Sequence, residues 1–154
     1  MIKAFYIKFP QYRWVTFRDM RGLSESEFGN ALRESCLAVW MDETSSYGTF
    51  PLEAMKSGVP VLGLVPNMVP SWMSEDNGIW INNKIQMVDF VADYVQNWLE
   101  DNINPSMVEE MLKTVENLST KEEFEKVSVS LFEGYINKRV ESFEEQLSKL
   151  QTIE

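Results

Sequence analysis

Residues 37–64 read LAVWMDETSSYGTFPLEAMKSGVPVLGL. Two short apolar runs, 37–41 and 59–64, frame it, and continuous apolar runs of this length are typical of strands buried on both faces of a parallel sheet. Between them we expect a loop and then a short helix over 52–57, because a proline precedes that helix and a glycine follows it. Strand, helix and strand in this order predict a β-α-β unit with parallel strands and a right-handed crossover.

Three further elements are expected before this unit. Residues 2–9 are rich in aromatic and β-branched side chains, which favours a strand. Residues 13–18 alternate between polar and apolar side chains, which also favours a strand. Ser24 and Glu27 have the spacing of a capping box and predict that a helix begins there.

After the unit, helical patterns dominate the chain. We expect a loop over 66–77, a strand over 78–81, an amphipathic helix over 85–100 and helices over 106–118 and 120–150. The predicted class is therefore α/β: a Rossmann-like layered domain with a mostly parallel sheet, followed by C-terminal helices. We assign residues 1–130 to this domain and 131–154 to a C-terminal helix.

Composition and charge exclude several classes of function. The 154 residues are expected to form one domain, and their 14 basic and 24 acidic side chains give a net charge of −10, which argues against nucleic acid as a partner. Without histidine the chain has no imidazole metal site and no histidine-based triad, and we assign it no metal or cofactor. With one cysteine, no signal-peptide pattern and no apolar run of ~20 residues, we expect a cytoplasmic protein.

The loop over 42–50 carries the candidate chemistry, because ligands of parallel sheets bind beyond the carboxyl ends of strands. Gly48 lets the backbone approach a ligand closely, and the free N–H groups at the start of the following helix favour an anion. The carboxylate of Glu53 can accept hydrogen bonds from two hydroxyl groups, as on a ribose. Together these groups describe a nucleotide site. The alternative at this point is that Glu53 is only a favourable charge near a helix start and Gly48 only a turn residue.

Three other side chains are expected to have structural roles. Trp72 is expected to pack in the fold, with coverage of a sugar or base face as the alternative. Cys36 is expected to be a buried, inert thiol at the end of a helix. Lys56 is expected to be a solvated surface residue rather than a phosphate ligand.

A motif in this stretch resembles the signature of a known family. It runs Gly48-x4-Glu53-Ala54-Met55-x2-Gly58-x-Pro60-Val61. This pattern is similar to that of retaining GT-B-fold glycosyltransferases of the large group 1 type (family four). The segments 77–81 and 88–99 resemble the strand and helix that follow in that family, and the similarity extends over roughly residues 14–130. The resemblance implies the carboxy-terminal, donor-binding half of a GT-B fold.

The resemblance also implies roles for individual residues. Glu53 matches the second Glu of an E-x7-E pair, which holds the ribose of a UDP- or GDP-linked sugar, and Ser45 stands where the family has the first Glu. A serine can donate a hydrogen bond to a sugar hydroxyl but supplies no charge. The implied donor-binding residues are Glu53, Ser45, Ser46, Tyr47, Gly48, Thr49 and Phe50. No catalytic residue is assigned to this chain.

The function that the resemblance implies is transfer of a hexose from a nucleotide-diphosphate sugar to a sugar or lipid-linked acceptor. The resemblance also implies that the acceptor site, and any peripheral contact with a membrane, belong to an N-terminal half outside this sequence. We therefore expect this chain alone to be inactive. The alternative is a non-catalytic pseudo-glycosyltransferase module that serves assembly. Apolar residues spaced four, three, four and three apart predict a homodimer through 135–150. Another doubly wound fold fits less well, because the acidic cluster and lysine of a response regulator are lacking.

Overall fold

The computed structural model describes residues 1–44, 47–118, 125–126 and 128–140. It divides into two compact units, Met1–Asn117 and Leu118–Glu154. In the second unit, residues 128–140 are helical, which agrees with the helix predicted there. Ile136 and Val140 of the predicted dimer stripe are exposed, and the rest of the stripe falls in 141–154, outside the described residues. The homodimer stays a prediction.

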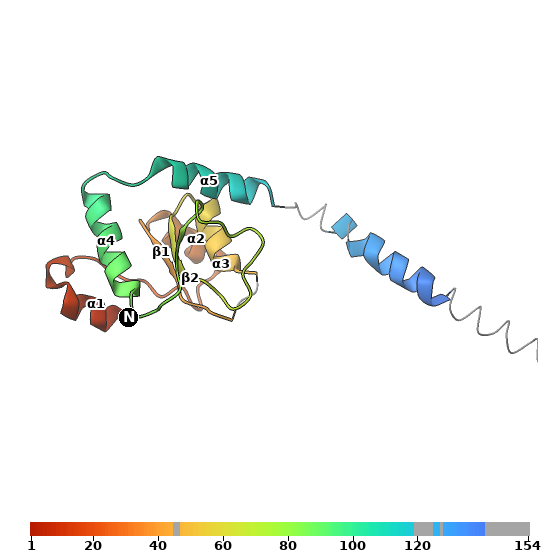
Figure 1. Cartoon of the computed structure of the whole chain (residues 1–154), viewed down its shortest axis with the longest axis horizontal. Helices are drawn as coiled ribbons and strands as arrows, with labels where there is room; N and C mark the ends of the chain where they lie inside the picture. Colours follow the sequence, from red (N-terminus) through yellow and green to blue (C-terminus); the bar gives the residue numbers. More distant parts are fainter. Residues whose placement is uncertain (45–46, 119–124, 127, 141–154) are drawn as a thin grey trace, which may run out of the picture. The chain divides into compact units, whose positions relative to one another are not determined.

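The first unit is built on a three-stranded parallel sheet (Figure 1). Its strands are Ala38–Trp40 (β1), Val61–Leu64 (β2) and Ile79–Ile81 (β3), in the order β1-β2-β3. Val39 lies opposite Leu62, and Leu62 lies opposite Ile79. The three strands predicted over 37–41, 59–64 and 78–81 are confirmed, and so is the α/β class with a parallel sheet.

Four helices lie where the sequence predicts them, although the one predicted over 52–57 begins three residues earlier, so that Pro51 lies inside it. They are Glu25–Arg33 (α2), Thr49–Lys56 (α3), Met87–Leu99 (α4) and Pro105–Glu116 (α5). The capping box before α2 is confirmed, because Ser24 Oγ accepts a hydrogen bond from the Glu27 amide while the Ser24 amide donates to the Glu27 carboxylate. Gly58 follows the end of α3 with φ at +73°, as expected for a residue just past a helix end. No helix among these residues, or elsewhere in the described ranges, is long and apolar enough to cross a bilayer.

The strand predicted over 2–9 is wrong. These residues form the helix Ile2–Lys8 (α1), followed by the 3₁₀ turn Pro10–Tyr12 (η1). The helix brings Phe5 and Phe9, four residues apart, onto one side, and Phe5 is fully buried against Tyr12 and α4. Burial of this aromatic face therefore outweighs the β preference of the individual residues.

The strand predicted over 13–18 is also wrong, although buried and exposed side chains do alternate along residues 15–18. Val15 and Phe17 are half-buried against the core, while Thr16 and Arg18 are exposed. The Tyr6 hydroxyl donates to the Val15 carbonyl, so a side chain takes the backbone acceptor that a neighbouring strand would use. The segment forms no ladder, and β1 is an edge of the described sheet.

Candidate functional site

The start of α3 presents free backbone N–H groups, as the sequence predicts. The helix begins at Thr49, two residues before Pro51, and Gly48 is its N-cap. The Leu52 amide donates to the Gly48 carbonyl at 3.4 Å, so the amides of Thr49 and Phe50 precede the first hydrogen bond of the helix and have no acceptor within it. Such amides, together with the helix dipole, favour an anion.

Two features favour glycine at position 48: its positive φ angle and the lack of space for a Cβ atom. Its φ is +72°, a conformation that L side chains rarely adopt. A Cβ at this position would lie 2.9 Å from Trp72 Cζ2 and 3.3 Å from Trp40 Cη2. These contacts support the alternative that Gly48 is a structural turn residue, and its close approach to a ligand stays a prediction.

Trp72 connects the loop after β2 to the residues that precede α3. Its indole N–H donates a 2.7 Å hydrogen bond to the Tyr47 carbonyl, and its ring lies edge-on to Trp80 at 5.9 Å between centroids. The expected packing role of Trp72 is therefore confirmed. Its coverage of a sugar or base stays a prediction.

Asn77 holds this loop in place, and the sequence analysis missed it. It is the single buried polar side chain in the described part of the chain. Its Nδ2 donates to the Trp72 carbonyl at 2.7 Å and to Thr114 Oγ1 at 3.0 Å, and its Oδ1 accepts from the Ser74 amide and the Trp80 indole. Every hydrogen-bonding position of the amide is thus used. The sequence places Asn77 at the end of the loop predicted over 66–77, but it gives no sign of these partners.

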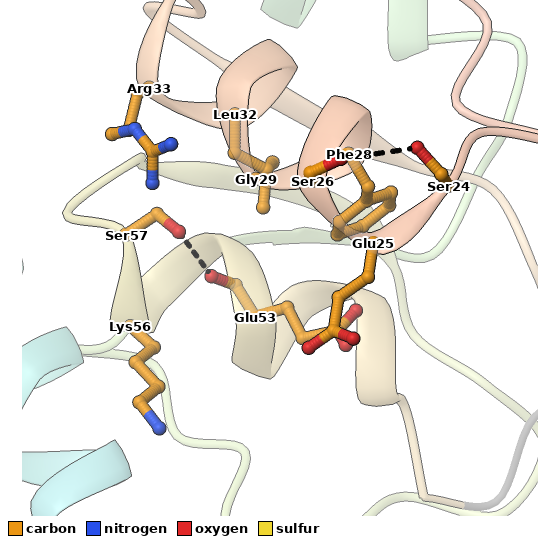
Figure 2. Close-up of a pocket in the computed structure, with 10 residues that line it drawn as sticks. All are labelled: Ser24, Glu25, Ser26, Phe28, Gly29, Leu32, Arg33, Glu53, Lys56 and Ser57. Carbon is orange, nitrogen blue, oxygen red and sulfur yellow. Dashed lines mark hydrogen bonds between the residues drawn. The ribbon is translucent and has the colours of Figure 1, made fainter.

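Glu53 is exposed and lines a wide, open surface cavity of about 710 Å³ between α2 and α3. The residues around it are Ser24, Glu25, Ser26, Phe28, Gly29, Leu32, Arg33, Lys56 and Ser57. Figure 2 shows the side chains of Glu53 and Glu25 extending toward one end of this cavity, with Arg33 near the other end and Lys56 extending away from α2. Within the described residues Glu53 has no ion-pair partner, so its carboxylate is available to a ligand.

An aromatic contact joins the two helices beside the cavity. Phe28 of α2 and Phe50 of α3 meet edge-on, with 6.0 Å between ring centroids and 78° between ring planes. Phe28 also lines the cavity, as Figure 2 shows. The side chain of Phe50 therefore packs against α2, while its amide stays at the start of α3.

The remaining predicted residues are placed as follows. Tyr47 and Thr49 are exposed, and Tyr47 contributes its carbonyl to the bond with Trp72. Ser45 and Ser46 lie outside the described residues. Lys56 is exposed, as expected for a surface lysine. The structure thus brings Glu53 to a cavity and the free amides to the start of the same helix.

The prediction for Cys36 is wrong, because this residue is exposed. It lies in the short connection between α2 and β1, and its carbonyl accepts a hydrogen bond from the Tyr94 hydroxyl at 2.7 Å. Neighbouring protein atoms withhold water from the sulfur and raise the pKa of the thiol. The apolar run that begins at Leu37 suggested burial, but Leu37 is only half-buried against the core and full burial starts at Ala38.

Comparison with known proteins found no matching family model, no matching curated protein and no matching solved structure. The functional assignment therefore depends on the residues and contacts described above.

Proposed function

We propose that this chain is the donor-binding domain of a cytoplasmic retaining glycosyltransferase with a Rossmann-like GT-B fold. Its ligand is a UDP- or GDP-linked sugar, and the reaction is transfer of a hexose to a sugar or lipid-linked acceptor. The observation that supports this proposal best is the placement of Glu53: its carboxylate has no ion-pair partner among the described residues and lines a cavity one helical turn after the free amides.

The spacing along α3 suits a nucleotide. Thr49 and Glu53 are four residues apart, so they share one face of the helix, separated by about 6 Å along its axis. Helical side chains lean toward the N-terminus, which directs the Glu53 carboxylate back toward the amides. A diphosphate at the amides of Thr49 and Phe50 and a ribose at Glu53 then fit one continuous ligand.

The electrostatics of the chain limit the expected affinity. The net charge is −10, and a diphosphate adds further negative charge. The helix dipole offsets the repulsion between the acidic chain and the diphosphate by only about 0.3–1 kcal/mol at an exposed site. We therefore expect weak binding. Because the resemblance assigns the acceptor site to another domain, we also expect binding without turnover.

The alternative is a non-catalytic module that serves assembly, and one contact favours it. The Trp72 ring lies against Gly48, in the loop that the resemblance assigns to the donor sugar, so a sugar would have to share that space. Ser45, where the family has a glutamate, also removes a charge. An assembly role through 135–150 predicts a sedimentation coefficient that rises with protein concentration.

Calorimetry separates the two functions. UDP, GDP and ADP are titrated into the wild type, Glu53→Ala and a control, Glu116→Ala, at the exposed end of α5. Loss of hydrogen bonds to a carboxylate should weaken a bound nucleotide about 10- to 100-fold in Glu53→Ala, without change in the control. If none of the three nucleotides binds the wild type, the donor-binding proposal fails and the assembly function is favoured.

A further inference from the structure

The edge of the sheet at β1 directs the backbone groups of Val39 outward. In a parallel ladder, alternate residues of a strand bond to opposite sides. The Ala38 amide donates to the Pro60 carbonyl at 2.9 Å, so Ala38 bonds to β2. The N–H and C=O groups of Val39, the next residue, therefore point away from β2. In the described part of the chain β1 is the outermost strand on this side, so no strand pairs with Val39.

A half-enclosed groove of about 1160 Å³ lies along this open edge. Residues 14–21 line one part of it, and residues 35–42, which include Val39, line another. The segment over 13–18 pairs with no strand of the described sheet, so it flanks the groove without closing the edge. The volume exceeds the roughly 300–1,000 Å³ of typical small-molecule pockets. The size of the groove therefore favours a peptide over a small ligand.

Apolar side chains from two helices line the groove. They are Phe28, Ala31 and Leu32 of α2, and Val91, Val95 and Trp98 of α4. The side chains of a strand point alternately to its two faces. Apolar lining from two helices therefore suits a strand that is apolar at consecutive positions, as strands inside parallel sheets are.

Charge favours a neutral or basic occupant over a second copy of this chain. Two arginines of the lining are paired with lining acids: Arg21 with Asp19 at 2.5 Å. The other pair is Arg18 with Glu34 at 3.5 Å. Asp42 adds a further negative charge to the lining. A second copy would bring a net charge of −10 to this acidic groove, whereas a neutral or basic segment meets no such repulsion.

We propose that this groove binds an extended, apolar segment of neutral or basic charge from a partner polypeptide, which adds a strand to the sheet beside β1. The Val39 N–H donates to one carbonyl of the incoming strand, and the Val39 carbonyl accepts from one of its amides. Such main-chain hydrogen bonds supply the affinity when a peptide joins an open sheet edge, and pockets for its side chains supply the specificity. The inference does not depend on the proposed function, because Val39 has no role in the donor site.

An NMR titration of the ¹⁵N-labelled full chain tests the pairing. The probe is the peptide acetyl-Lys-Val-Ala-Val-Ala-Val-Lys-amide. Its matched control carries N-methyl groups on the three central residues, which removes hydrogen-bond donors but keeps the side chains and the charge. We expect the Val39 amide signal to shift with the probe, and the N-methylated peptide to bind about 10-fold or more weakly.

A second amide reports on the opposite edge of the sheet. The Val65 amide donates to the Ile81 carbonyl, so Ile81 bonds to β2 and the backbone groups of Trp80 point away from it. Trp80 therefore lies at an open edge like that of Val39, but it does not line the groove. Its amide signal should shift far less than that of Val39.

Substitutions at Val39 test the same bonds from the protein side. Val39→Pro removes the outward N–H, and edge strands tolerate proline where that group is outside the ladder. We expect it to weaken the probe about 10-fold or more, whereas Val39→Thr keeps the N–H and should bind as the wild type does. Urea unfolding shows whether both variants fold. If Val39→Pro does not fold, the N-methylated peptide decides alone, because it leaves the protein unchanged.

A probe with glutamate in place of both lysines tests the charge of the occupant. It should bind about 10-fold more weakly than the lysine probe, and equal binding would show that the groove does not select basic segments.

Four further results would overturn the proposal. Equal binding of the plain and N-methylated peptides excludes backbone pairing, and equal shifts at Val39 and Trp80 exclude selection by the groove. If the Val39 signal moves with protein concentration alone and Val39→Pro stops this movement, the occupant is a second copy. If the lysine probe shifts no amide signal, the groove does not bind an extended segment.

Discussion

The indole N–H of Trp72 donates a 2.7 Å hydrogen bond to the carbonyl oxygen of Tyr47, 25 residues earlier in the chain. This bond joins the loop after β2 to the loop before α3, at the place where the candidate ligand site begins. Asn77 holds the carbonyl of the same tryptophan and also binds Thr114 of α5. The start of α3 is therefore connected through two side chains to a helix far along the sequence.

Replacing Trp72 tests the hydrogen bond to Tyr47 apart from the packing of the ring. Trp72→Phe keeps an aromatic ring but removes the N–H donor, and we expect the free energy of unfolding to fall by about 1–3 kcal/mol, counting the smaller ring. Urea denaturation measures this change. Trp14→Phe is the matched control, because Trp14 is 53% exposed and should be nearly neutral. Equal effects of the two substitutions would count against a structural role for the Trp72 bond.

Gly48 offers a comparison in which backbone strain is held constant. Gly48 and Gly22 have nearly the same φ, +72° and +73°, but an added Cβ would meet Trp72 at 2.9 Å only at Gly48, and no atom within 4 Å at Gly22. Gly22→Ala should therefore cost about 1–2 kcal/mol of unfolding free energy, the left-handed penalty alone. Gly48→Ala should cost about 1–3 kcal/mol more, because a packed ring must shift. If Gly48→Ala and Gly22→Ala lose the same unfolding free energy in urea, the Trp72 ring moves aside without cost and its contact with Gly48 is not a packing constraint.

Asn77 should be among the most sensitive positions of the first unit. Asn77→Ala leaves the Trp72 carbonyl and the Ser74 amide without their present partner, whereas the Trp80 indole keeps its 2.7 Å hydrogen bond to the Ser74 carbonyl. We expect a loss of about 2–4 kcal/mol in unfolding free energy, measured by urea denaturation. Asn82→Ala is the control, since Asn82 is exposed and should change stability by less than about 0.5 kcal/mol. A loss at Asn77 as small as at Asn82 would contradict the described network.

Acid should weaken the capping box before α2. Hydrogen bonds from the Ser24 hydroxyl and amide lower the pKa of Glu27 from its ordinary value of 4.5. A lowered pKa in the folded state means that the stabilisation is present above pH 4.5 and is lost as the pH falls through the folded value. Urea unfolding at pH 7 and pH 3 should therefore show a smaller acid-induced loss for Ser24→Ala than for the wild type. If the wild type and Ser24→Ala lose the same unfolding free energy between pH 7 and pH 3, the capping box does not cause the acid-induced loss.

The sequence predicted the parts of the fold that depend on local pattern. The apolar runs of β1 and β2 are buried in a parallel sheet, and the Ser24 and Glu27 spacing produces the expected cap. The helix Ile2–Lys8 was predicted as a strand because its β-branched and aromatic residues favour one. The helix forms because it lets Phe5 pack against η1 and α4, and the local sequence does not specify these contacts. Segment 13–18 has the alternation of a strand, but no neighbour pairs with it.

In the candidate site, too, features that depend on local sequence could be predicted, and features that depend on tertiary contacts could not. The place of Glu53 on a helix after the loop follows from the order of strand, loop and helix. Its role in holding a ligand depends on the family resemblance and stays a prediction. The contacts of Trp72 and Asn77 could not be predicted in this way, because their partners belong to elements distant in sequence. Those contacts are set by packing, which the pattern of single residues does not specify.

An NMR titration that follows the backbone amides of Thr49 and Phe50 tests nucleotide binding at the start of α3. UDP, GDP and ADP are each added to ¹⁵N-labelled wild type and Glu53→Ala. We expect these two amide signals to shift with at least one nucleotide, well beyond the signal of Gly58 just past the end of α3, and Glu53→Ala to reduce the shifts at equal ligand concentration. If both signals stay in place with every nucleotide, or move equally in Glu53→Ala, the donor site is not at the start of α3.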